Sequence, residues 1–348
     1  MKHFLSTLVL LFCVLFSFSQ QKEYKIKTIA FYNLENLFDT IDNPDKKDEY
    51  SPILQMKSGK ENAYIQKIEN AAKVISEIGK EKSKKSPSII GVCEIENSEV
   101  LDDLLKSDYL KNEGYNYVHV DSPDWRGIDV ALIYKESDFS VSDFKAYELK
   151  AWNSEGYRIK TRSQLLVSGY LDGELIHIIV NHWPSQRGGA KKSEYLRVKS
   201  AELNLKIIED IYFEEPNAKI ITLGDFNDNP DSKSIKKTLR SKEKKKNTND
   251  RELYNPFANM YKRGFGSLGF RDNMNLFDQI LLTSNFLPKE STDYDSYLFY
   301  KAAIYNPNYL TTRKGRYKGY PFRSWSNGNF TGGFSDHYPV YIYLIKEK

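Results

Sequence analysis

The chain has 348 residues, of which 40% are apolar and 14% aromatic, and its formal net charge is +4. This length and apolar content are sufficient for a large hydrophobic core, arranged as one α/β domain or as two domains. The net charge is too small to indicate a nucleic-acid partner by itself.

The N-terminus is typical of a secretory signal peptide over residues 1–19. Lys2 and His3 precede an apolar run over residues 4–18, and the small residues Ser17 and Ser19 supply a cleavage site. The apolar run is shorter than the roughly 20 residues that a membrane span needs. We therefore expect export to the periplasm or the medium, and no stable membrane span. Removal of this segment leaves Cys93 as the only cysteine, which excludes an internal disulfide.

Short apolar runs bounded by turn residues predict nine strands, at residues 24–32, 88–94, 115–120, 128–135, 163–171, 174–183, 218–226, 276–283 and 338–345. Two segments have helical periodicity. Residues 61–80 place Ile65, Ile68, Ala72, Ile75 and Ile78 on one face, and residues 193–213 do the same with Leu196, Ala201, Leu205 and Ile208. Many strands with few helices favour a sheet-rich α/β sandwich over strict βαβ alternation.

Residues 311–325, TTRKGRYKGYPFRSW, mix cationic and aromatic side chains. Such a segment is either a solvated loop or the wall of a groove in which cations neutralise phosphate and rings stack on bases.

Polar side chains end several of the predicted strands or directly precede them. They are Asn33 and Glu35, Glu94, Asn181 and His182, Asp225 and Asn227, Asp278, and the pair Asp336-His337. In sheet-based α/β folds, ligands commonly bind in the rim of loops where strands emerge. We therefore expect these side chains to form one site.

The residue types in this set indicate a hard divalent cation, Mg²⁺, Mn²⁺ or Ca²⁺, because carboxylate and amide oxygens are its preferred ligands. Two histidines and one cysteine are too few for a typical Zn²⁺ site. The histidines add groups that exchange protons near neutral pH. A metal beside paired histidines points to hydrolysis of a phosphate ester by an activated water.

In order and spacing, these segments resemble the endonuclease/exonuclease/phosphatase superfamily. The resemblance rests on Asn33-x-Glu35, Glu94, Asn181-His182, the run GDFN at 224–227, Asp278 and the run SDH at 335–337. The superfamily includes pancreatic-type deoxyribonucleases, abasic-site endonucleases, neutral sphingomyelinases and inositol polyphosphate phosphatases. The resemblance implies a four-layer α/β sandwich with two mixed β-sheets flanked by helices, formed by residues 20–348 as a single catalytic domain.

The resemblance also implies residue roles. Asn33, Glu35, Glu94 and Asp336 would hold the metal, Asp225 and Asn227 would position the attacking water and the phosphate, and His182 and His337 would act together as acid and base. Asp278 would orient His337. Asn181 would contact the substrate. A second group matches less closely: Asp129 would orient His182, and Arg126, Arg162 and Arg187 would contact the substrate. Cys93 stands where the family often has Gln, and we expect it to be a small buried residue.

The sequence therefore predicts an exported, monomeric phosphodiesterase that depends on Mg²⁺ or Mn²⁺, or on Ca²⁺, with DNA or RNA as substrate. The histidine at position 182 and the run HWPSQRGG over 182–189 resemble extracellular nucleases. A sphingolipid or phospholipid phosphodiesterase, a phosphatase of small phosphate esters and an inactive nucleic-acid-binding module remain as alternatives.

Overall fold

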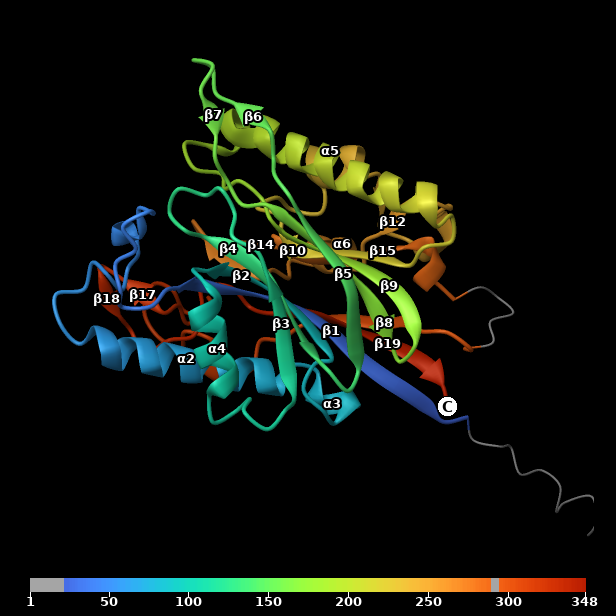
Figure 1. Ribbon diagram of the computed structural model, residues 1–348, viewed down its shortest axis with the longest axis horizontal. Helices are drawn as coiled ribbons and strands as arrows, with labels where there is room; N and C mark the ends of the chain where they lie inside the picture. Colours follow the sequence, from blue (N-terminus) through green and yellow to red (C-terminus); the bar gives the residue numbers. More distant parts are fainter. Residues whose placement is uncertain (1–21, 289–293) are drawn as a thin grey trace, which may run out of the picture.

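The computed structural model describes residues 22–288 and 294–348. The predicted signal peptide, residues 1–19, lies outside the described residues. Within them, two large β-sheets pack face to face, with α5 on the outer side of one sheet and α2 and α4 on the outer side of the other (Figure 1). The predicted α/β sandwich with two mixed sheets flanked by helices is confirmed.

The first sheet has six strands in the order β16-β19-β1-β2-β4-β3. Only β1 and β2 are parallel neighbours, and the other pairs are antiparallel. The strands are β1 (Tyr24–Leu37), β2 (Ile89–Ile95), β3 (Tyr115–His119), β4 (Asp129–Lys135), β16 (Leu298–Ile304) and β19 (Val340–Glu347).

The second sheet has seven strands in the order β11-β12-β15-β10-β9-β8-β5. Here β9 and β10 are parallel, as are β11 and β12. The strands are β5 (Phe139–Tyr147), β8 (Gln164–Leu171), β9 (Glu174–His182), β10 (Ile220–Asp225), β11 (Ser241–Lys242), β12 (Leu253–Tyr254) and β15 (Asp278–Thr283). Three short hairpins pair β6 (Ala151–Trp152) with β7 (Arg158–Ile159), β13 (Leu268–Phe270) with β14 (Asn273–Asn275), and β17 (Trp325–Ser326) with β18 (Asn329–Phe330).

The α-helices are α2 (Lys60–Glu77), α3 (Lys80–Ser83), α4 (Ser98–Lys106), α5 (Ala190–Glu214) and α6 (Phe257–Lys262). Short 3₁₀ segments lie at η1 (Asp48–Tyr50), η3 (Lys245–Asn247), η4 (Ser284–Phe286) and η5 (Asn308–Leu310), and a π-helical turn at η2 (Lys233–Thr238). In the described part of the chain, none of the helices combines the length and apolar character needed to cross a membrane.

Apolar side chains on both faces of the strands build the core, because successive side chains of a strand point to opposite faces of its sheet. In β1, Ile29 and Phe31 belong to the cluster between the two sheets, together with Leu223 of β10. Ala30 and Tyr32 belong to the cluster that also contains residues of α2 and α4. A third cluster packs α5 against the outer face of the second sheet.

The two predicted helices form, but their buried faces differ from the predicted ones. In α2, Ile68 and Ile75 are buried, whereas Ile65 is 60% exposed and Lys67 is buried instead. In α5 the buried face carries Arg197 and Asn204 beside its apolar residues. Apolar periodicity missed these polar side chains because each is buried against a polar partner from another segment: Lys67 against the Leu34 carbonyl, Arg197 against Asp228 and Asn204 against Asn181.

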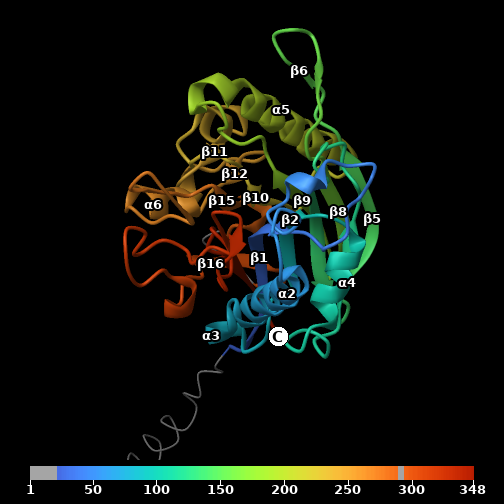
Figure 2. The same ribbon diagram turned by 90° about the vertical axis from the view of Figure 1, so that its left-hand side faces the viewer.

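The topology brings one end of both sheets together. The C-terminal ends of β1, β2, β9 and β10 lie beside the N-terminal ends of their antiparallel neighbours β15 and β19. These strand ends lie at the left of Figure 1 and face the viewer in Figure 2.

Candidate active site

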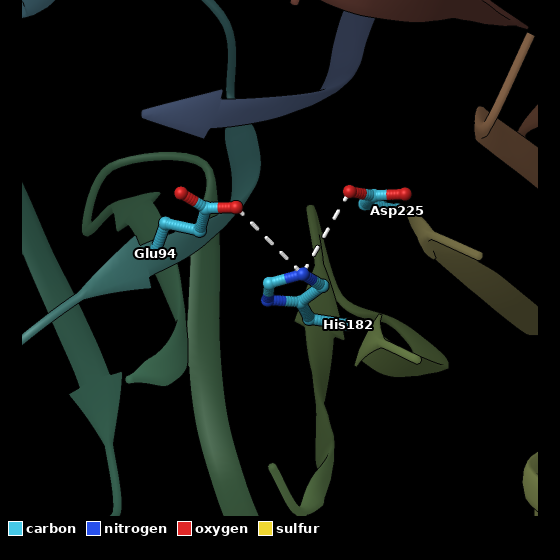
Figure 3. A group of neighbouring side chains, drawn as sticks. All are labelled: Glu94, His182 and Asp225. Carbon is cyan, nitrogen blue, oxygen red and sulfur yellow. Dashed lines mark ion pairs between the residues drawn. The ribbon is translucent and has the colours of Figure 1, made fainter. Parts of the chain in front are cut away.

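Two carboxylates and one imidazole meet where the two sheets converge. Glu94 comes from β2 of the first sheet, and His182 and Asp225 come from the ends of β9 and β10 in the second. His182 Nε2 lies 3.8 Å from Glu94 Oε1 and 3.7 Å from Asp225 Oδ2, and both carboxylates point toward that nitrogen (Figure 3). One ligand atom of each residue lies within 4.8 Å of the others, so the group can hold a metal ion.

The strand register explains why the second sheet presents its polar residues in a row. Asp225 is paired with His182 on one side and with Asp278 on the other. His337, just before β19, then reaches Asp278, and its Nδ1 lies 2.6 Å from Asp278 Oδ2. His337 Nε2 is 4.0 Å from Asp225 Oδ2, the same oxygen that faces His182. The two histidines therefore converge on one carboxylate from different strands.

A bulge in β2 directs Glu94 into the site. Its pairing with β4 shifts between Cys93 and Ile95, and Glu94 has a left-handed backbone with φ of 60°. Glu35 and Asn227 also have positive φ, of 48° and 50°. Such conformations are costly for residues other than glycine and tend to cluster at functional sites.

Asn33 links the carboxylates of the two sheets. Its amide nitrogen donates to Glu94 Oε1 and to Asp225 Oδ2, both at 3.1 Å, while its oxygen accepts the backbone N–H of Glu35. Its predicted role as a metal ligand stays a prediction. The geometry shows that Asn33 sets the distance between Glu94 and Asp225.

Glu35 and Asp336, also predicted as metal ligands, are bridged by Arg323. The guanidinium donates to Glu35 Oε1 through Nε and to Asp336 Oδ2 through Nη2, both at 3.2 Å. Glu35 is buried and also accepts the backbone N–H groups of Ser324 and Trp325. In this arrangement Glu35 anchors the segment around residue 324, beside the group of Glu94, His182 and Asp225 (the Glu94 cluster).

Behind Glu35 lies a fully buried lysine, Lys67. Its ammonium donates to the Leu34 carbonyl and to Ser324 Oγ, both at 2.7 Å. Burial lowers the pKa of Lys67 to about 8, against the opposing effect of Glu35. Burial and the nearby Asp336 raise the pKa of Glu35 to about 7. Sequence analysis missed both Lys67 and Arg323, and the only signal for Lys67 was a cation within the apolar pattern of its helix.

The pKa values of the two histidines are shifted in opposite directions. Burial opposes the charged form of His337, but the charge and hydrogen bond of Asp278, with Asp225 and Asp336, outweigh it and raise its pKa well above the usual value. Burial, helped by Arg162 and Arg126, lowers the pKa of His182 well below the usual value. Opposite shifts of this kind separate a proton donor from a proton acceptor.

Of the two predicted asparagines that remain, one lies in the site and the other lies behind it. Asn227 lies in the site: its backbone N–H donates to Asp225 Oδ1 at 2.9 Å and its amide to the Trp183 carbonyl. Asn181 is fully buried, and its amide bonds the carbonyls of Ile179 and Leu223 and the side chain of Asn204. This geometry does not support substrate contact by Asn181, since its hydrogen bonds tie β9 to β10 and α5.

The prediction that Asp129 orients His182 is wrong. Asp129 Oδ2 lies 3.2 Å from His119 Nε2, and its Oδ1 accepts the backbone N–H of Ser122. His182 Nδ1 is buried and has no hydrogen-bond partner in the described residues. The register explains this result, because β3 is antiparallel to β4 and places His119 close to Asp129.

The three predicted arginines lie at different depths. Arg162 is buried, donates to the Trp183 carbonyl at 2.7 Å and pairs with Asp124 at 3.4 Å. Arg126 is half-buried and also pairs with Asp124. Arg187 is exposed and lines, with Arg126, Tyr50 and Trp125, a cavity of about 360 Å³.

A second cavity, of about 880 Å³, adjoins the site at Asp336. Residues of the predicted cationic and aromatic segment 311–325 line it, together with Phe270, Arg271 and the hairpin around β17. Gln55 lines both cavities. The segment is therefore a wall of a groove beside the site.

The donor set fits a hard divalent cation, because Glu94 and Asp225 offer carboxylate oxygens without a lysine or arginine paired to them in the described residues. Burial raises the pKa of Asp225 to about 7, with His337 acting in the opposite direction. A bound cation would favour the ionised carboxylate.

Residues 28–346 match the profile of the Endonuclease/Exonuclease/phosphatase family. The chain belongs to this family. Members of the endonuclease/exonuclease/phosphatase family are metal-dependent phosphoric ester hydrolases, and the chain is such an enzyme. No curated protein sequence matches it significantly.

Solved structures of the family share the fold. A humanized TDP2 of D. rerio with 14 mutations has 13% identity and a TM-score of 0.54, covering 92% of this chain and 99% of that one. A D. rerio TDP2 complexed with a single-strand DNA product has 14% identity and a TM-score of 0.53, covering 92% and 98%. A mannosyl-6-phosphatase of Bacteroides thetaiotaomicron VPI-5482 has 17% identity and a TM-score of 0.53, covering 91% and 99%.

Proposed function

We propose that the chain is an exported nuclease that hydrolyses phosphodiester bonds of nucleic acid with the help of Mg²⁺ or Mn²⁺. The choice of nucleic acid rests on one observation, the 880 Å³ cavity beside Asp336. Its wall carries Arg271 and Arg316 beside Phe270 and Tyr317. Arginines neutralise backbone phosphates and aromatic rings stack on bases, which suits an extended polyanion better than a small ester. The similar TDP2 that holds a single-strand DNA product supports the same choice.

The chemistry follows from the two histidines. A divalent cation held by Glu94 and Asp225 would polarise a phosphoryl oxygen and stabilise the charge that develops in the transition state. Asp278 accepts the Nδ1–H of His337 and raises the pKa of the ring well above its usual value, so the imidazolium also carries a proton at Nε2, which it can give to the leaving oxygen. Burial keeps His182 neutral, and its Nε2, which faces Glu94 and Asp225, can accept a proton from the attacking water. Asn227 and Asn33 keep Asp225 in place between them.

A second candidate function is hydrolysis of a small phosphate ester. The 360 Å³ cavity favours it, since Trp125 and Tyr50 can cover a sugar ring while Arg126 and Arg187 meet a phosphate. The similarity to a mannosyl-6-phosphatase points the same way.

The deciding experiment presents the protein without residues 1–19, in Mg²⁺, with plasmid DNA, single-stranded DNA, RNA, sphingomyelin, inositol phosphates and mannose 6-phosphate. We expect cleavage of nucleic acid at a kcat/KM at least an order of magnitude above that for the small esters, and loss of cleavage in EDTA with recovery on adding Mg²⁺. Preference for mannose 6-phosphate would favour the second candidate, and preference for sphingomyelin would contradict both.

Export is tested separately, by locating the full-length protein in periplasmic, extracellular and cytoplasmic fractions of an expressing cell.

A further inference from the structure

A second acidic group lies outside the active site, in the segment between β1 and α2. One carboxylate oxygen from each of Asp42, Asp48 and Glu49 lies within 4.8 Å of the others. Asp42 and Glu49 are exposed, while Asp48 is only 1% exposed. The segment is the blue loop at the left end of the molecule in Figure 1.

Asp48 has a buried oxygen that nothing in the described structure satisfies. Its Oδ2 accepts the backbone N–H of Asn43 at 2.9 Å, but its Oδ1 is buried without a hydrogen-bond partner. An unpaired buried carboxylate oxygen is costly, and the usual solutions are a hydrogen bond, an ion pair or a metal.

A fourth carboxylate lies beneath Asp48. Glu96 is buried, accepts the backbone N–H of Asp39 at 2.9 Å, and lies within hydrogen-bonding reach of the Asp48 carboxylate. The two lysines directly before Asp48 do not neutralise this pair. Lys46 Nζ donates to the Ser122 carbonyl, and Lys47 Nζ lies over the Trp125 ring. Glu96 can donate a hydrogen bond to Asp48 only as the protonated acid, whereas a hard cation satisfies both carboxylates in their ionised form.

We propose that Asp42, Asp48 and Glu49, with Glu96 beneath them, bind one Ca²⁺. Calcium takes six to eight oxygen ligands in flexible geometry, which suits several carboxylates on an irregular loop, whereas Mg²⁺ demands a near-ideal octahedron and keeps its waters. The set contains no histidine or cysteine, which disfavours zinc. None of the four residues belongs to the Glu94 cluster.

The site would stabilise one wall of the 360 Å³ cavity. Tyr50 and Ser51 follow the acidic group directly and line that cavity with Trp125. The backbone N–H of Lys47 donates to the Trp125 carbonyl at 2.8 Å, and the Tyr50 ring packs edge-on against Trp125 at 6.0 Å. Calcium bound at Asp48 would hold this segment in place without taking part in the chemistry.

The test is cleavage after Lys46 and Lys47 by endoproteinase Lys-C, which does not depend on calcium, followed by mass spectrometry of the fragments. Ca²⁺ at about ten times its Kd should slow cleavage at these two sites by about tenfold, because only the closed loop binds the ion. The Asp48→Asn variant keeps the shape of the side chain and should lose this protection. Asp45→Asn, an exposed aspartate of the same segment outside the group, should keep it.

A Glu94→Gln variant separates this site from the catalytic metal and should keep full protection. Equal protection of wild type and Asp48→Asn, or loss of protection in Glu94→Gln alone, would overturn the proposal. Equal protection by Mg²⁺ would overturn the assignment to calcium. If Asp48→Asn fails to fold, the exposed pair Asp42→Asn and Glu49→Gln provides the same test. No substrate is involved, so the result does not depend on the proposed nuclease activity.

Discussion

The two histidines of the site are held by different means. His337 is fixed by its hydrogen bond to Asp278, which Ser267 Oγ also contacts at 2.5 Å. His182 has a buried Nδ1 without a partner in the described residues, and packing alone sets its ring. The protonated state of His337 therefore depends mainly on Asp278, with help from Asp225 and Asp336, whereas the neutral state of His182 depends mainly on burial.

Replacing His337 with Ala should lower kcat on the preferred substrate by on the order of 10² or more, the scale expected when a general acid or base is removed. His177→Gln is the matched control. His177 lies on the same strand as His182 but bonds Ser168 and Glu215 instead. Steady-state kinetics should show less than about a twofold change in the control, because His177 hydrogen-bonds none of the site residues and Gln can keep a hydrogen bond to one of its partners. A near-normal kcat in His337→Ala would refute the assignment.

Asp278→Asn should shift the pH dependence of kcat. The substitution removes the charge and the acceptor that raise the pKa of His337, so the pKa of His337 falls. If His337 must carry a proton, activity declines as pH rises through its pKa, and the alkaline limb of the profile moves to lower pH. The measurement is the pH–rate profile of both proteins in saturating metal. An unchanged alkaline limb would show that another group sets it.

Among the strands, the close contact between β9 and β10 positions Asp225. Gly224 is paired with Asn181, and a Cβ at Gly224 would lie 2.3 Å from the Asn181 carbonyl oxygen. That oxygen belongs to the backbone of a buried strand, so it cannot move without separating the strands. Asp225 follows directly, and any separation moves its carboxylate away from His182.

Gly224→Ala should therefore cost about 1–3 kcal/mol of unfolding free energy, the range for overpacking a core, and should also weaken metal binding. Urea unfolding measures the first effect, and titration of activity with Mg²⁺ the second. Ser140→Ala, an exposed position on β5, should change stability by less than about 0.5 kcal/mol. A Gly224→Ala protein as stable as this control would show that the strands can relax.

The polar residues at the strand ends of the site could be predicted because the sequence signal for each one is local. A polar residue after an apolar run marks a strand end, and the topology then brings Glu94, His182, Asp225 and Asp278 together. Lys67, Arg323 and Asp124 were not predictable, since their partners lie far away in the sequence or outside any motif. Asp129 was misassigned for a related reason. Its sequence suggested an orienting acid, but the choice between His119 and His182 depends on which strand pairs with β4.

Across the molecule, the two cavities on either side of the site distinguish a polymer substrate from a small one. Arg271 and Arg316 stand exposed along the larger cavity, each over an aromatic ring, Phe270 and Tyr317. Neither arginine forms a salt bridge within the described residues, so both are available to phosphates away from the bond that is cleaved. A short substrate would contact only the site itself.

The double variant Arg271→Ala and Arg316→Ala should raise KM for single-stranded DNA by about tenfold. It should also reduce the slope of log KM against log salt by about 1.4, because each lost phosphate contact on a single strand contributes about 0.7. Hydrolysis of bis(4-nitrophenyl) phosphate, which is too small to reach these arginines from the site, should be unchanged.

The matched control for this pair is Arg240→Ala with Arg251→Ala. These two exposed arginines line neither cavity, so KM and its salt dependence should stay near wild type. If both double variants reduce the salt slope equally, the effect reports net charge alone. If neither does, the polymer must lie elsewhere, and the cavity beside Trp125 becomes the next candidate. Arg126 and Arg187 line it together with Asn36, whose backbone N–H donates to Glu94.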